Sequence, residues 1–131
     1  MGLEEIRRRV MEDLKPLLEN VTGILIYGSW ARGEETQRSD VDICLVAPGA
    51  DGIKLTRKAL SLLKDDRFDV RVFELLPLYL KMAVIDEGVV VYAKDIPELY
   101  EYFYSFRKLW EDQKHRQTLS KEEARELLAK M

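Results

Sequence analysis

Apolar residues follow two different periods along the chain, and the changes of period divide it into predicted helices and strands. The first helix is predicted from apolar residues that recur every three or four positions among charged ones, namely Leu3, Ile6, Val10, Leu14, Leu17 and Leu18. A continuous apolar run from Ile24 to Tyr27 follows. Because this run is short and rich in β-branched residues, it favours a buried strand.

A second predicted strand begins with two carboxylates among apolar residues. Asp40 and Asp42 alternate with Val41 and Ile43, and a further apolar run continues to Val46. Side chains two residues apart on a strand lie on the same face, at a separation of about 7 Å. Flexible carboxylates at that separation can reach two metal ions that lie about 4 Å apart. The pattern therefore predicts a site for divalent cations, with Mg²⁺ and substrate phosphate the best match to incomplete carboxylate ligation.

A glycine-serine pair ends the first predicted strand and precedes the carboxylates. Gly28 allows the backbone to approach a ligand closely, and a strand-to-helix turn leaves unpaired N–H groups that can face an anion. Ser29 adds a hydroxyl group. Residues 30–32 are expected to form a helical turn that Gly33 ends. Arg32 is a candidate phosphate ligand, and an ion pair with a nearby carboxylate is an equally good interpretation.

Helices and strands alternate after the second strand. A helix is predicted over residues 53–64, and its apolar face is expected to contain Ile53, Leu55, Leu60, Leu62 and Leu63. Alternating residues then predict a strand over about 68–74. Pro77 and Gly88 mark the start and the end of a further helix. A short apolar strand follows over 89–92.

The C-terminal part, about residues 95–131, is predicted to be helical. Asp95 and Pro97 open a helix whose apolar and aromatic face contains Ile96, Leu99, Phe103, Phe106 and Trp110, widened by Tyr100, Tyr102 and Tyr104. The spacing of three and four indicates a packing face and not a platform for stacking bases. Ser120 and Glu123 form a capping-box pattern, which predicts a separate final helix.

These elements predict an α/β fold, with strands at about 23–28, 41–47, 68–74 and 89–92 in a mixed β-sheet backed by helices. A chain of 131 residues is long enough for one compact domain and too short for two. We therefore expect a single domain over residues 1–131 that includes the C-terminal helical segment.

Charge and composition exclude several classes of protein. The net charge of -3 and the pI near 5.3 argue against extensive nucleic-acid binding. The single cysteine, Cys44, lies in a predicted buried strand and is expected to pack as a small apolar residue. Residues 1–20 mix acids and bases, unlike a signal peptide, and no run of about 18 apolar residues predicts a membrane span. A cytoplasmic protein without membrane attachment is expected.

The stretch from Gly28 to Val46 resembles a known family signature. Gly28-Ser29, ten intervening residues and then Asp40-Val41-Asp42 are similar to the signature of the nucleotidyltransferase superfamily that includes DNA polymerase beta. The stretch looks most like the minimal nucleotidyltransferases of prokaryotes, which are often paired with a HEPN-domain partner in toxin-antitoxin modules. Related motifs often have a basic residue where this chain has Trp30, so the phosphate contacts at that position are expected to differ.

The resemblance implies a set of catalytic and metal-binding acids. It assigns these roles to Asp40, Asp42 and a third acid on a neighbouring strand, for which Asp69 is the best match. In the implied mechanism the third acid deprotonates or orients the acceptor hydroxyl. Glu74 is the rival candidate, although it would lie on the opposite face of the same strand. A purely structural ion pair of Asp69 with Arg71 or Arg67 is the alternative interpretation.

The resemblance also implies substrates and a partner. Two Mg²⁺ ions and ATP are expected, with the nucleotide bound by Gly28, Ser29, Arg32 and Ser39. The implied reaction transfers AMP from ATP to a hydroxyl group, expected to be a tyrosine of a HEPN-type toxin that the chain neutralises as an antitoxin. One alternative is a small-molecule nucleotidyltransferase of the aminoglycoside type, with a site completed across a homo-oligomer. Another is a non-catalytic antitoxin that binds its partner by occlusion.

Overall fold

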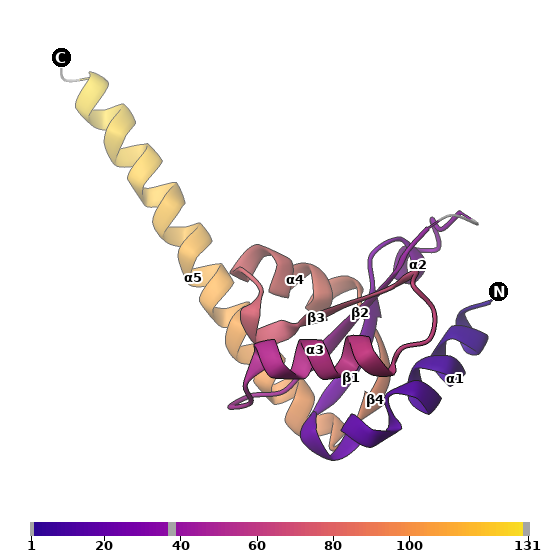
Figure 1. Ribbon diagram of the computed structural model, residues 1–131. Helices are drawn as coiled ribbons and strands as arrows, with labels where there is room; N and C mark the ends of the chain where they lie inside the picture. Colours follow the sequence, from indigo (N-terminus) through magenta and orange to yellow (C-terminus); the bar gives the residue numbers. More distant parts are fainter. Residues whose placement is uncertain (1, 37–38, 130–131) are drawn as a thin grey trace.

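A four-stranded sheet forms the centre of the computed structural model, which describes residues 2–36 and 39–129 (Figure 1). The chain has eleven elements in this order: α1 (Leu3–Asp13), η1 (Lys15–Asn20), β1 (Gly23–Tyr27), α2 (Ser29–Arg32), β2 (Val41–Val46), α3 (Gly52–Leu62), β3 (Phe68–Val72), η2 (Phe73–Leu75), α4 (Leu78–Glu87), β4 (Val89–Ala93) and α5 (Ile96–Ala129).

The sheet has the strand order β3-β2-β1-β4, and its strand directions are mixed. Strand β1 pairs antiparallel with both β2 and β4, whereas β2 and β3 pair in parallel. The register places Asp42 of β2 between Tyr27 of β1 and Asp69 of β3. The mixed sheet with backing helices confirms the predicted fold class and brings two of the predicted site acids side by side.

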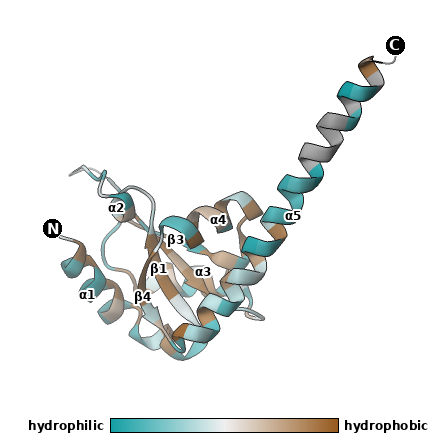
Figure 2. Cartoon of the chain, turned by 180° about the vertical axis from the view of Figure 1, so that it is seen from behind, coloured by the Kyte–Doolittle hydropathy of each residue, from teal (hydrophilic) through white to brown (hydrophobic). Residues whose placement is uncertain are grey.

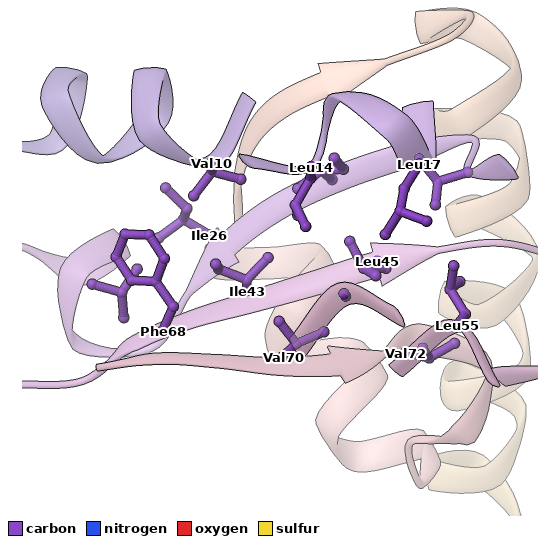
Figure 3. Close-up of a cluster of buried hydrophobic side chains, with 14 of the residues drawn as sticks. Val10, Leu14, Leu17, Ile26, Ile43, Leu45, Leu55, Phe68, Val70 and Val72 are labelled. Atoms are coloured by element: carbon purple, nitrogen blue, oxygen red, sulfur yellow. The ribbon is translucent and has the colours of Figure 1, made fainter. Parts of the chain in front are cut away.

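Helices cover both faces of the sheet, which explains why β1 and β2 are apolar at nearly every position. Ile43 and Leu45 of β2 pack toward α1, η1 and α3, in a cluster that Figure 3 shows around Val10, Leu14, Leu17 and Leu55. Cys44 and Val46 point the other way, into a second cluster with residues of η2, α4 and α5. Strands that are buried on both faces lose the polar alternation of a half-exposed strand.

The first predicted helix is shorter than its apolar pattern suggested. Helix α1 ends at Asp13, and a 3-10 helix from Lys15 to Asn20 follows. Pro16 stands at the start of this 3-10 helix. Proline lacks an N–H and its ring clashes with the preceding helical turn, so it cannot continue α1. Leu17 is nevertheless buried in the core.

The predicted apolar face of α3 was wrong at two positions. Leu55 and Ala59 are its buried residues, whereas Ile53 and Leu60 are exposed. Residues four apart lie on the same side of a helix, so Leu55 and Ala59 together define the side that meets the sheet. Ile53 and Leu60 are seven residues apart and share another side, which faces solvent.

The C-terminal region forms one long helix and not two. Helix α5 runs without interruption from Ile96 to Ala129, so the helix start predicted at Ser120 is wrong. A capping pattern starts a helix only where the preceding backbone is not helical, and the good helix formers on both sides of Ser120 favour continuation. Tyr102 packs beside Phe73, whereas Tyr100 and Tyr104 are exposed and do not widen the packing face.

Part of α5 extends away from the rest of the molecule (Figure 1). Its residues Leu99 and Phe103 are buried against the sheet, whereas the described side chains from Glu111 to Arg116 are exposed. Figure 2 shows hydrophilic residues along much of the projecting part. In the described part of the chain, no helix combines the length and the apolar character needed to cross a membrane.

Candidate active site

The candidate site lies where β1 ends and β2 and β3 begin. Asp42 is the second residue of β2 and lies directly opposite Asp69, the second residue of β3. The neighbouring residue Val41 is fully buried, whereas Asp42 is half-buried. The strand alternation therefore directs Val41 into the core and the Asp42 carboxylate to the other face of the sheet.

Gly28 is the residue that makes room for the Asp42 carboxylate. Its backbone has φ 76° and ψ -151°, a conformation that residues with a side chain rarely adopt. A Cβ atom at this position would overlap an Asp42 carboxylate oxygen. The sequence predicted that Gly28 lets the backbone approach a ligand; in the structure the group that lies against Gly28 is the Asp42 carboxylate of the chain itself.

The turn after Gly28 forms the predicted short helix. Helix α2 covers Ser29–Arg32 and ends at Gly33, whose φ of 71° lies in the left-handed region. The Gly28 carbonyl accepts hydrogen bonds from the N–H groups of Ala31 and Arg32. The N–H groups of Ser29 and Trp30 have no recorded acceptor within the described residues, so they are available to an anion.

Asp69 lies in the same face of the sheet as Asp42 and forms an ion pair with Arg71. The Arg71 guanidinium Nε is 3.5 Å from an Asp69 carboxylate oxygen, and both side chains are largely exposed to solvent. An exposed ion pair of this kind contributes at most about 1 kcal/mol, so a ligand can displace Arg71 readily. The pairing with Arg71 was one of the two interpretations that the sequence left open.

Electrostatics around Asp42 favour binding of a cation. Burial raises the pKa of Asp42, and the negative charges of Asp69 and Asp40 raise this pKa further. Arg71 and Arg32 act in the opposite direction but are smaller contributions. A carboxylate whose charged form is disfavoured by neighbouring acids is stabilised when a cation binds beside it.

The site acids alone do not form a complete metal-binding site. Over residues 2–36 and 39–129, no group of three His, Cys, Asp or Glu side chains is close enough to hold a metal ion. Asp40 precedes β2 and is exposed. The donor set nevertheless fits Mg²⁺, which commonly takes one or two carboxylates and completes its shell with water and substrate phosphate.

Tyr27 is a site residue that the sequence analysis did not identify. It is the last residue of β1, lies opposite Asp42 and is half-buried. Burial, followed by the charge of Asp42, raises the pKa of Tyr27 to about 12. Because Tyr27 ends an apolar run, the sequence pattern grouped it with the core residues before it. Only its phenolic hydroxyl distinguishes it from them.

Two predicted nucleotide-binding residues have partners within the chain. Arg32 forms ion pairs with Glu34 at 3.0 Å and with Glu87 of α4 at 3.1 Å. Both hydrogen-bonded carboxylates raise the pKa of Arg32. The Ser39 hydroxyl accepts a hydrogen bond of 2.8 Å from the Thr36 N–H.

Glu74, the rival third acid, lies away from this site. Strand β3 ends at Val72, two residues earlier than predicted, and Glu74 belongs to the 3-10 helix that follows. Its carboxylate accepts a hydrogen bond from the Ala47 N–H at 2.9 Å and another from the Tyr102 hydroxyl at 2.8 Å. These bonds give Glu74 a structural role between the sheet and α5.

Cys44 and Trp30 are both buried close to the site. Burial raises the pKa of the Cys44 thiol well above its ordinary value, so the thiol stays protonated and unreactive. The Trp30 side chain packs in the core below α2, and its indole Nε1 has no hydrogen-bond partner within the described residues. Trp30 therefore holds α2 against the sheet by apolar packing.

Comparison with known proteins identifies relatives by sequence. A family model described as polymerase beta nucleotidyltransferase matches residues 12–97. The chain is 43% identical over 99 residues to a protein of Methanocaldococcus jannaschii named "Putative protein adenylyltransferase", with 76% of this chain and 77% of that protein covered.

Solved structures share the fold at lower sequence identity. A chain of a toxin-antitoxin complex with AMP-PNP has a TM-score of 0.66 and 22% identity, covering 86% of this chain and 94% of that chain. A chain from a complex of a tri-AMPylated Shewanella oneidensis HEPN toxin with an MNT antitoxin has a TM-score of 0.64 and 18% identity, covering 88% and 93%. These similarities confirm the polymerase-beta-like nucleotidyltransferase fold.

The family model includes β1, α2, β2 and β3, which carry the glycine-serine turn and the site acids. It spans more than half of the chain, and the archaeal relative matches three quarters of it. This chain therefore belongs to the polymerase beta nucleotidyltransferase family and is a nucleotidyltransferase.

Proposed function

We propose that this nucleotidyltransferase transfers AMP from ATP to a hydroxyl group of a partner protein, specifically a tyrosine of a HEPN-type toxin, and thereby acts as an antitoxin. The observation that carries the proposal is the placement of Asp42 between Gly28 and Asp69, beside the free N–H groups of α2. The name of the archaeal relative and the toxin-antitoxin complexes that share the fold support the choice of a protein acceptor.

The N-terminal turn of α2 is proposed to bind the triphosphate of ATP. The N–H groups of Ser29 and Trp30 and the Ser29 hydroxyl supply hydrogen bonds, and the positive end of the helical turn favours negative charge. Arg32 can exchange its exposed ion pair with Glu87 for a phosphate oxygen, because both are charge-assisted contacts of similar strength. Ser39, whose hydroxyl accepts a hydrogen bond from the Thr36 N–H shortly before β2, is also proposed to contact the nucleotide.

Asp69 is proposed to accept the proton of the acceptor hydroxyl. The hydroxyl oxygen forms a bond to the α-phosphorus of ATP, the bond from that phosphorus to the bridging oxygen breaks, and pyrophosphate leaves. Asp40, Asp42 and Asp69 are the residues that would hold two Mg²⁺ ions. When bound, Mg²⁺ would neutralise charge on the phosphates, and the site acids would hold the ion in position. Because the reaction requires ATP, we place it in the cytoplasm.

The experiment that tests this proposal combines the protein with α-labelled ATP, Mg²⁺ and the HEPN-type toxin encoded in the same genome. Transfer of label to a toxin tyrosine is expected, and mass spectrometry identifies the modified residue. The matched control is the double variant Asp40→Asn, Asp42→Asn, which should bind the toxin but not label it. EDTA should abolish labelling by the unaltered protein.

Each other outcome rejects part of the proposal. Label on the toxin that persists in the double variant would reject the metal-binding acids. Neutralisation of the toxin without any label would favour occlusion. Transfer of label only to a low-molecular-weight acceptor, such as an aminoglycoside, would reject the protein acceptor.

A further inference from the structure

The outer edge of β3 has unpaired backbone groups. Strand β3 is at the end of the sheet and pairs only with β2 in the described chain. The Val41 N–H of β2 donates to the Arg67 carbonyl at 2.9 Å. In a parallel pair, alternate residues of a strand direct both N–H and C=O to the partner. With the observed register, Asp69 and Arg71 bond to β2, so the backbone groups of Val70 and Val72 point outward.

A groove runs along this edge. It has a volume of about 460 Å³, and β3 contributes the four consecutive residues from Asp69 to Val72 to its wall. Consecutive strand residues point to opposite faces of a sheet. A groove that touches all four therefore lies beside the strand in the plane of the sheet, where a further strand would lie.

Two exposed apolar side chains line the groove. Ile53 of α3 and Leu75 of η2 are among its lining residues and are 60% and 58% exposed. Both are large apolar residues without cover, next to an open strand edge. Native proteins usually protect such an edge, because it pairs readily with another chain.

The charge of the groove wall indicates what kind of segment it fits. Helix α3 carries Lys54, Arg57 and Lys58 and has no acidic residue. Arg57 lines the groove and has no ion pair recorded in the part of the chain that the structure describes. An acidic residue of a partner would therefore find an opposite charge here without displacing an existing pair.

We propose that the protein acceptor docks as an added strand on the outer edge of β3. An extended segment pairs its backbone with Val70 and Val72, places an apolar side chain against Ile53 and Leu75 and an acidic one beside Arg57, and presents its hydroxyl residue to Asp69. Backbone pairing supplies affinity and the side-chain contacts supply specificity, as in other cases of strand addition. This inference rests on the proposed transfer to a protein, because Asp69 joins the groove to the candidate active site.

The first test measures AMP transfer to the HEPN-type toxin by groove variants and matched controls. Ile53→Glu should lower kcat/KM for the toxin about tenfold or more, since a charge replaces an apolar contact. Leu60→Glu is the control, because Leu60 is on the same side of α3, is 51% exposed and does not line the groove. Arg57→Glu should also lower kcat/KM, whereas Lys58→Glu, with the same change of charge outside the groove, should not. The Kd for MgATP should be unchanged in all four variants.

The second test detects the added strand directly. Amide hydrogen exchange of Val70 and Val72 should slow about tenfold or more when the toxin is added, because their N–H groups gain acceptors. Unchanged exchange at both amides, or equal transfer by Ile53→Glu and Leu60→Glu, would overturn the docking proposal. Slowing that depends on the concentration of this chain alone would also overturn it, because a second copy would then occupy the edge.

These measurements separate this inference from the proposed function. If the unaltered protein transfers no AMP to the toxin, the proposed function fails, and the exchange of Val70 and Val72 still shows whether the toxin docks on β3. If transfer occurs but neither the groove variants nor the amide exchange respond, the proposed function stands and the strand addition fails.

Discussion

At the scale of single residues, Asp42 is the acid with the strongest structural evidence for a functional role. It is half-buried, contacts Gly28 and lies opposite Asp69. Asp42→Asn keeps the shape of the side chain and removes its charge. We expect the rate of AMP transfer to fall roughly 1,000-fold, since metal neutralisation of charge is worth several kcal/mol. Circular dichroism should show an unchanged fold, and a variant that retains full activity would remove Asp42 from the site.

Gly28 is predicted to tolerate no side chain. Gly28→Ala places a Cβ against the Asp42 carboxylate in a backbone conformation that alanine adopts only with strain. Activity should fall by on the order of 100-fold, because a small displacement of a site group has an effect of that size. Gly33→Ala is the matched control, since Gly33 also has positive φ but has open space around its Cβ position. The control should lose stability without a comparable loss of activity.

Asp65 offers a test of pH dependence outside the site. Hydrogen bonds from the Arg67 guanidinium and N–H lower the pKa of Asp65 below its ordinary value of 3.8. A lowered folded-state pKa gives stability that is present above the unfolded pKa and is lost as pH falls through the folded one. Chemical denaturation should therefore show Asp65→Asn to be less stable than the unaltered protein at pH 7, and the difference should shrink below about pH 4. A difference that is constant with pH would contradict the charged interaction.

At the scale of elements, Glu74 connects η2 to β2 and α5 through its two hydrogen bonds. Glu74→Ala leaves the Ala47 N–H without its acceptor, and we expect a loss of about 1–3 kcal/mol in the free energy of unfolding. Glu74→Gln retains an acceptor oxygen and should lose less. Transfer activity per folded molecule should be the same in both variants, whereas Asp69→Asn should lose activity. The opposite result would make Glu74 the third acid.

Strand β3 is shorter than predicted, and for this reason the sequence alone did not give the position of Glu74 relative to Asp69. Alternation alone continued the strand to residue 74 and placed Glu74 on it. The chain instead turns into η2 at Phe73, whose ring packs against Tyr102, Phe103 and Phe106 of α5. Glu74 therefore does not continue the strand alternation, and its carboxylate instead meets the Ala47 N–H and the Tyr102 hydroxyl, away from Asp42 and Asp69.

At the scale of the whole molecule, the projecting end of α5 is predicted to contribute little to the stability of the domain. Deletion of residues 117–131 should change Tm by less than about 2 °C, because Leu99 and Phe103, the buried side chains of α5 among those that the structure describes, lie near its start. Differential scanning calorimetry checks this result. A fall of more than about 5 °C would show that the deleted segment packs on the domain.

The sequence by itself determined the fold class and predicted the chemistry of the candidate site. Two-residue alternation predicted that Asp40 and Asp42 share one face, although β2 begins at Val41 and only Asp42 of the two lies on the strand. The apolar runs of β1 and β2 required cover on both faces of a sheet. Gly28 and Ser29 indicated a close backbone approach with free N–H groups. These features depend on short-range geometry, which neighbouring residues fix without help from distant parts of the chain.

Only the tertiary structure decided which distant residues meet. The pairing of β2 with β3 brings Asp69 opposite Asp42, the register with β1 places Tyr27 beside Asp42, and η2 brings Glu74 to Ala47 and Tyr102. The open edge of β3 and the exposure of Ile53 likewise follow from strand order and helix rotation. Such contacts depend on how complete elements pack together, because a side chain of given polarity fits a sheet edge, a core or a solvent face equally well until its neighbours are in place.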